Sequence, residues 1–326
     1  MKKIVGLAFL QVLFFPLLSL AHHGGVSLPF GPGTPIETSS PLTLPEGGLV
    51  VYTRAEQVEW RKFQFAEPHN KSSFTFLSAG TSYGFTPYLT GNFSIPYNIK
   101  REDSAGSNSG IGDIRFSSIL GFNYSNGNGF RLNTQKEDAI SLEGVRKTFF
   151  TLYGGFTVPT GKHKEQLAGE IDPAMQPGFG SPSFTLGMNA GRGIFKSLSV
   201  VVDVSMDYFT QRDNFRFGNE YRFNLAGVQE LYGNTQNFIA KIDGILEFNL
   251  LQISRDEKGG ERQRASGGTI LYLTPGIRFS FPRLQNANLG LGLKIPILKS
   301  LNEQSEQQGA EGLEKYRAIA TLSLYF

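Results

Sequence analysis

The stretch Ser197 to Phe209, SLSVVVDVSMDYF, decides the fold. Its even-numbered positions, from Leu198 to Tyr208, are apolar, and most of its odd-numbered positions carry serine or aspartate. Side chains alternate across a β-strand, so this period of two gives one apolar and one polar face. Strands of soluble sheets usually span roughly 5–6 residues, whereas a tilted strand that crosses a bilayer needs about 9–11. The length of this run therefore favours a membrane strand.

The same alternation recurs in Asn237–Leu250, Asn288–Ile297 and Tyr316–Phe326, and no fixed repeat of the kind that a β-solenoid needs is present. We expect an all-β fold, a closed antiparallel transmembrane β-barrel. Because an even number of strands returns both ends to the periplasm, about twelve strands suit such a barrel. The expected strands lie near 47–60, 72–84, 87–100, 111–125, 145–159, 180–192, 197–211, 219–231, 235–254, 266–281, 286–300 and 315–326.

The connections between these strands alternate between short and long. The longer set is polar and is expected on the outside of the cell, where the loop 160–179 is the longest and the best candidate for a constriction. The stretch 126–144 is an exception, because it is long but falls on the periplasmic side. The longer connections are 61–71, 101–110, 160–179, 212–218, 255–265 and 301–314.

The N-terminus reads as a secretory signal peptide over residues 1–21. Lys2 and Lys3 precede an apolar run that ends in Ser19-Leu20-Ala21, a small-x-small cleavage pattern. Residues 22–46 contain several prolines and little periodicity, which predicts an extended periplasmic segment before a barrel over residues 47–326. Loss of the two lysines takes the net charge from +3 to +1, so no nucleic-acid partner is expected.

The chain ends on an alternating strand that closes with Tyr325 and Phe326. A terminal aromatic residue on such a strand looks like the signal that outer-membrane proteins present to the barrel-assembly machinery. We therefore expect the protein in the outer membrane of the cell, with membrane lipid and the assembly machinery as partners. There is no cysteine, so the exported chain has no disulfide.

Charged residues on the polar faces of the strands are the first candidates for function. A lysine or arginine that faces lipid at the bilayer midplane costs about 2–4 kcal/mol, so these side chains should point into the lumen. There they either line a pore or fill the interior with mutually bonded pairs, and both possibilities stay open. The mixed signs predict weak ion selectivity. The lumen candidates are Asp113, Arg115, Lys147, Asp203, Asp207, Arg222, Lys241, Asp243, Glu247, Arg278, Lys294 and Arg317.

Few residues of the sequence suggest metal binding or catalysis. His22 would carry the free α-amine after cleavage, and with His23 it forms a candidate copper site. His69 and His163 have no serine beside them in a catalytic motif, so neither an enzyme nor a cofactor is expected. Aromatic residues near strand ends predict an interfacial girdle made of Tyr83, Tyr88, Tyr97, Tyr124, Tyr208, Tyr272, Tyr316 and Phe326.

Several segments resemble one known family. They are Tyr83-Gly84-Phe85-Thr86-Pro87 running to Ile95-Pro96-Tyr97, Gly110-Ile111-Gly112-Asp113-Ile114-Arg115, Phe156-Thr157-Val158-Pro159-Thr160-Gly161-Lys162, Asp172 to Ser181, Gly267 to Gly276, and Leu293-Lys294-Ile295-Pro296-Ile297. In this order they resemble the outer-membrane transporter family often labelled as a phenol-degradation meta-pathway protein. The resemblance covers about residues 28–326 and implies a barrel and a transport role. It implies no catalytic residue, and nothing in the sequence supports an aromatic substrate.

These observations predict an outer-membrane channel that passes a small solute by diffusion through a charge-lined lumen. The alternative is a barrel that anchors a surface protein whose loops bind a partner. The longest outer loop is short for a dedicated adhesin, which favours the channel. An outer-membrane hydrolase is the third and weakest hypothesis.

Overall fold

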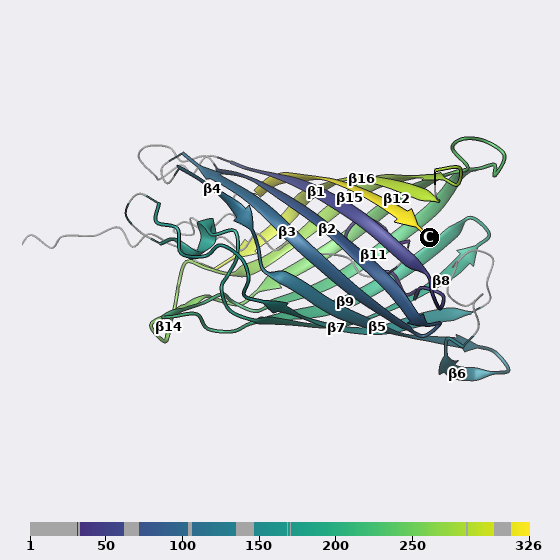
Figure 1. Cartoon of the computed structure of the whole chain (residues 1–326), viewed down its shortest axis with the longest axis horizontal. Helices are drawn as coiled ribbons and strands as arrows, with labels where there is room; N and C mark the ends of the chain where they lie inside the picture. The colour runs from purple at the N-terminus through teal and green to yellow at the C-terminus, as the bar shows by residue number, and fades with distance from the viewer. Residues whose placement is uncertain are drawn as a thin grey trace, which may run out of the picture.

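The computed structural model describes residues 31, 33–61, 72–103, 106–134, 147–167, 169, 171–284, 286–302 and 314–326. Twelve long antiparallel strands form a closed barrel (Figure 1). β1 pairs with β17, and β3 pairs with β5, which closes the ring of hydrogen bonds. The strands are β1 (Leu49–Trp60), β2 (Ser72–Thr86), β3 (Leu89–Glu102), β5 (Ile114–Ser125), β7 (Thr148–Val158), β8 (Ser183–Phe195), β9 (Leu198–Phe209), β11 (Glu220–Gly233), β12 (Lys241–Ile253), β15 (Gly268–Phe281), β16 (Ala287–Leu301) and β17 (Glu314–Tyr325).

The predicted fold class is confirmed, and so is the number of long strands. Five short strands were not predicted. β4 (Gly106–Ile111) extends the pairing of β3, and β6 (Gly129–Leu132) pairs with the end of β5 inside the stretch 126–144. The other three form a small separate sheet: β10 (Phe215–Arg216), β13 (Glu257–Lys258) and β14 (Glu261–Arg262). Among the described residues, no helix is long and apolar enough to cross a membrane.

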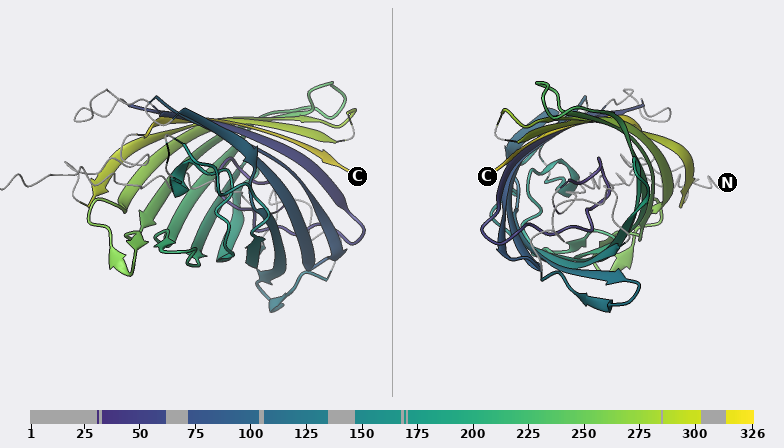
Figure 2. Two further views of the ribbon diagram at one scale, coloured as in Figure 1. Left: turned by 60° about the vertical axis from the view of Figure 1, so that its left-hand side comes forward. Right: turned by 90° about the vertical axis from the view of Figure 1, so that its right-hand side faces the viewer.

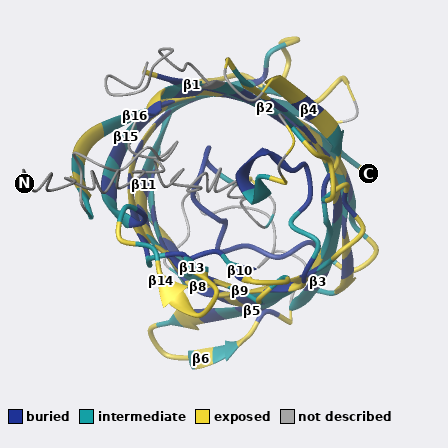
Figure 3. Ribbon diagram, turned by 90° about the vertical axis from the view of Figure 1, so that its left-hand side faces the viewer, coloured by how far each residue is buried: buried dark blue, intermediate teal, exposed yellow. Residues whose placement is uncertain are grey.

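The two faces of the wall differ as the alternation predicts. On β9, Ser199, Val201 and Asp203 are buried inside the barrel, whereas Val204 and Tyr208 are exposed on the outside. Many leucine, isoleucine and phenylalanine residues of the strands are exposed on the outer face. Figure 3 marks the exposed parts of the chain in yellow. Tyr272 was wrongly predicted on this face. Its ring is buried inside the barrel, where its hydroxyl donates to Glu314.

The described N-terminal residues lie inside the barrel and not in the periplasm. Residues 35–44 are buried, and they cross the interior enclosed by the strands (Figure 2). Asn189 of β8 donates to the Ser40 carbonyl, and the Leu44 amide donates to Thr90 of β3, so both walls hold the segment. The expected periplasmic placement of 22–46 is therefore corrected for its described residues, because the lumen offers partners to their backbone groups. We call residues 33–46 the N-terminal plug.

A second segment enters the lumen from the opposite end. Residues 159–182 connect β7 to β8 and contain the short 3-10 helix η2 (Pro173–Met175). Met175 is fully buried in a cluster with Val58, Trp60, Phe74 and Phe76, which point inward from β1 and β2. We call residues 159–182 the inward loop.

The exposed apolar band allows a test of membrane insertion. We expect Met188→Arg, on the outer face near the middle of β8, to destabilise the barrel in lipid vesicles by about 2–4 kcal/mol. The matched change Phe195→Arg, at the end of the same strand, should cost about 0–1 kcal/mol, because an arginine there reaches the headgroups. Urea unfolding in vesicles measures both values. Equal costs at the two positions would contradict a lipid-facing band.

Candidate functional site

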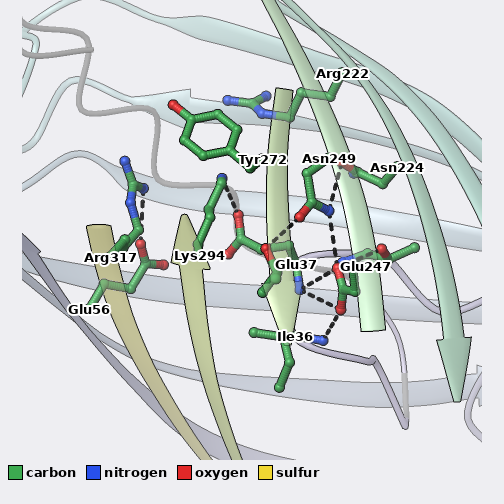
Figure 4. Close-up of polar contacts among 12 residues, drawn as sticks. Ile36, Glu37, Glu56, Arg222, Asn224, Glu247, Asn249, Tyr272, Lys294 and Arg317 are labelled. Carbon is green, nitrogen blue, oxygen red and sulfur yellow. Dashed lines mark hydrogen bonds and ion pairs between the residues drawn. The ribbon is translucent and has the colours of Figure 1, made fainter. Parts of the chain in front are cut away.

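The carboxylate of Glu247 anchors the N-terminal plug (Figure 4). Its Oε2 accepts hydrogen bonds from the backbone amides of Glu37 and Thr38, both 3.1 Å away, and from the Thr38 hydroxyl at 2.8 Å. The Ile36 amide donates to Oε1. Glu247 is completely buried on the inner face of β12. Several donors thus satisfy one buried anion, which is the condition under which such a charge is tolerated.

Glycines in the wall make room for the plug. The Ile36 side chain lies against β15 and β16, where a Cβ at Gly276 would fall 2.6 Å from Ile36 Cγ1. A Cβ at Gly292 would fall 2.5 Å from Ile36 Cγ2. Contacts this short do not occur between real atoms, so only glycine at these two positions allows Ile36 to dock.

A chain of alternating charges surrounds the plug. Glu37 accepts from Lys294 Nζ at 2.6 Å and also pairs with Arg54. Arg54 Nε donates to Glu56 at 2.7 Å. The other oxygen of Glu56 pairs with Arg317 at 3.1 Å, and Arg317 in turn contacts Glu314. This network links the plug to β1, β16 and β17, on both sides of the seam that closes the barrel.

Two further polar clusters lie on the inner wall. Arg222 bonds to Asp207 and Glu220, while Asp203 accepts from Tyr153 at 2.7 Å and from Asn224 at 2.9 Å. In the other cluster, Asp243 pairs with Arg278 at 2.8 Å and with Lys241 at 3.2 Å. Arg278 also donates to the Gly33 carbonyl of the plug at 2.8 Å.

Asp113 holds the inward loop. One of its oxygens accepts from the Gly161 amide at 2.9 Å, and the other accepts from the Phe179 amide at 2.7 Å and the Gly180 amide at 3.1 Å. From β3, Lys100 donates to the Ala174 carbonyl and Asn98 donates to the Pro177 carbonyl. Both ends of the inward loop are therefore tied to the wall.

All twelve lumen candidates are buried or half-buried in the structure, and eleven lie on or beside the inner faces of the strands. The twelfth, Asp113, lies just before β5 and serves the inward loop. Lys147 is half-buried directly before β7. The sequence analysis missed Glu37, Arg54, Glu56, Glu220 and Glu314. Arg54 and Glu56 stand two residues apart on β1, a spacing that would have revealed them once the register was fixed.

The structure describes one of the four histidines, so the predicted copper site at His22 and His23 stays a prediction. His22, His23 and His69 lie outside the described residues. His163 Nδ1 bonds to the Gly161 carbonyl, 2.8 Å away, and its ring packs against Gly180, which accounts for its position without catalysis. Among the residues that the structure describes, no group of three or more His, Cys, Asp or Glu could hold a metal ion.

Described residues line three neighbouring cavities in the barrel interior. The largest, of about 170 Å³, lies under Pro173, Gln176 and Phe179 of the inward loop. The second has about 110 Å³, and the third, of about 20 Å³, reaches Glu37 and Ser39 of the plug. Arg115 lines all three. The interior is thus partly filled, and these three cavities meet at one arginine.

No protein-family model matches the chain, and no curated protein matches its sequence. Among solved structures, the chain is similar to an outer membrane channel from Pseudomonas putida F1, at 12% identity and a TM-score of 0.64, over 91% of this chain and 100% of that one. Two weaker similarities are the beta domain of the Bordetella autotransporter Brka (10% identity, TM-score 0.47, 86% of this chain and 100% of that one) and OccAB1 of Acinetobacter baumannii (8%, 0.38, 86% and 96%).

The first similarity shows that the chain has the fold of an outer-membrane barrel. At this identity it carries no information about the substrate, and the phenol label suggested by the family resemblance gains no support from it. The two weaker similarities add nothing to the argument.

The anchoring of the plug can be tested with a cysteine reporter, because the chain has no cysteine of its own. Ser39→Cys places a thiol in the buried plug. We expect it to react with a water-soluble maleimide at least about ten-fold faster when Glu247→Ala is added. That change removes hydrogen bonds to a carboxylate, each of which contributes about 1.5–3 kcal/mol.

Two controls accompany this measurement. Glu230→Ala removes a carboxylate that pairs with Lys241 and not with the plug, so it should leave the rate unchanged. Asn128→Cys, in an exposed turn, should react equally fast in every background. The same rate for Ser39→Cys with and without Glu247 would show that the carboxylate does not hold the plug.

Proposed function

We propose that this protein is an outer-membrane channel that passes a small solute through its barrel. The observation that carries the proposal is the group of cavities around Arg115, which are lined mostly by polar and charged residues. One of them borders the inward loop and another borders the plug. A wall built only to anchor surface loops has no need of enclosed polar space. The similarity in fold to a bacterial outer membrane channel agrees with this proposal.

The mechanism is passive diffusion with two obstructions in series. The N-terminal plug and the inward loop are held by hydrogen bonds, ion pairs and the packing of Ile36 and Met175, and neither is part of a strand ladder. Such contacts can be exchanged for contacts with water one at a time, whereas the ladder of the wall cannot. Solute passage would therefore require displacement of one or both segments while the barrel stays intact.

Export and assembly into the outer membrane would depend on the two ends of the chain. Residues 1–21 would direct export and be cleaved, and the strand that ends in Tyr325 and Phe326 would engage the assembly machinery. Phe326 exchanges backbone hydrogen bonds with Leu49 at the seam, and its side chain is exposed. An exposed aromatic ring at the end of the last strand suits both an assembly signal and an interfacial anchor.

The second candidate function is a barrel that anchors a binding surface, and the partly filled interior favours it. The two hypotheses differ in one measurable property, since only a channel conducts ions after the obstruction is removed.

We expect the mature protein to show small unitary steps in planar bilayers, and a chain that lacks residues 33–44 to show severalfold larger ones. The reason is that these residues occupy the lumen. Folding of each sample is checked by its resistance to SDS before heating. An unchanged conductance would identify the inward loop as the narrower obstruction. Silence from both folded samples would contradict the channel and favour the anchor.

A further inference from the structure

Arg115 differs from the other arginines inside the barrel. Arg54, Arg222, Arg278 and Arg317 each bond to at least one carboxylate. Arg115 is half-buried on β5, yet its side chain makes no hydrogen bond or ion pair with any residue in the described part of the chain. A guanidinium offers five N–H donors and stays charged at any physiological pH. Because a charge removed from bulk water needs compensation, this side chain offers a binding site for an anion.

The carboxylates around Arg115 are already bonded to other groups. Asp113 accepts three backbone N–H groups of the inward loop. Asp207 bonds to Arg222 and to the Thr185 hydroxyl. Glu220 also bonds to Arg222. Each of these carboxylates has at least one protein donor, whereas the side chain of Arg115 has no acceptor within hydrogen-bond distance among the described residues. The cavity is therefore suited to an anionic ligand rather than a cation.

The cavity of about 170 Å³ also has an apolar side. Phe76, Phe179, Phe209 and Phe217 line it together with Arg115. Phe179 packs against Phe217 with ring centroids 4.6 Å apart and against Phe209 at 6.1 Å, so these three rings form one continuous surface. A cavity of about 150 Å³ accommodates benzene, so 170 Å³ holds a ligand of roughly six to eight non-hydrogen atoms.

We propose that Arg115 binds the carboxylate of a small organic acid whose apolar body lies against these four phenylalanines. A carboxylate matches the planar fork of a guanidinium, which donates two parallel hydrogen bonds to it. The inference deepens the proposed function by naming its class of solute, and the transport of that solute rests on that function. Binding itself does not require conduction.

Hexanoate is the probe, and titration calorimetry on the folded, full-length protein in detergent is the measurement. We expect saturable binding of hexanoate and at least ten-fold weaker binding of acetate, which lacks the apolar body, and of hexylammonium, which has the opposite charge. Arg115→Gln should weaken hexanoate binding at least ten-fold, and Arg115→Lys should weaken it less because the charge remains.

Arg192→Gln is the matched control. Arg192 lies exposed at the end of β8 away from the cavities, so this variant should bind hexanoate like the wild type and corrects for partition into micelles. All variants are first checked for SDS resistance. Equal binding of hexanoate by the wild type and Arg115→Gln would overturn the proposal, as would tighter binding of hexylammonium.

Bilayer recordings separate this proposal from the proposed function. Hexanoate binding that depends on Arg115, in a protein that never conducts, would support the anion site and contradict the channel. Conductance in a protein that does not bind hexanoate would support the channel and overturn the anion site.

Discussion

Every backbone N–H and C=O group of a chain that crosses lipid must find a partner inside the protein, and the remaining features of this barrel follow from that requirement. Strands meet it only if the sheet closes, which the pairing of β1 with β17 achieves. A closed wall fixes the alternation of side chains, so one set meets lipid and the other the lumen. The charged residues of β9, β11, β12 and β17 are thereby forced inward. Once they are inside, they in turn need partners of their own, and the plug supplies several of them.

The plug provides bonding partners for charged groups that are buried on the inner wall. Among the described residues, no arginine or lysine bonds to Glu247, whose carboxylate accepts hydrogen bonds from the amides of residues 36–38 instead. Glu37 brings a carboxylate to Lys294 and Arg54, two cations on opposite sides of the seam. If the plug were removed, Glu247, Lys294 and Arg54 would have to bond to water instead. The stability of the wall and the obstruction of the lumen are therefore coupled, and any opening must hydrate the groups that the plug now satisfies.

The sequence predicts this fold well because membrane strands obey a local rule. The twelve long strands could be located within a few residues from alternation alone, and so could the inward direction of Asp203, Asp207, Asp243 and Glu247. The site depends on contacts between distant residues, which a local pattern does not contain. No residue near Glu37 in the sequence indicates that its partner is Lys294. The prolines of residues 22–46 predicted an extended linker, not a segment bound inside the barrel. Tyr272 was misplaced because its hydrogen-bond partner Glu314 lies on β17, at the far end of the chain, and its apolar neighbours Leu251 and Ile253 lie on β12.

The plug also constrains the order in which the molecule can be assembled. Its anchors lie on β1, β12 and β16, so its final contacts cannot form until nearly the whole chain is available. It directly precedes β1, which pairs with the last strand, and a seam that had already closed would force the plug to thread in from one open end. The simplest history is that residues 33–46 settle against the curved sheet while β1 and β17 are still apart. The closing of the seam would then enclose the plug, which is synthesised before every strand but completes its contacts only after most strands have formed.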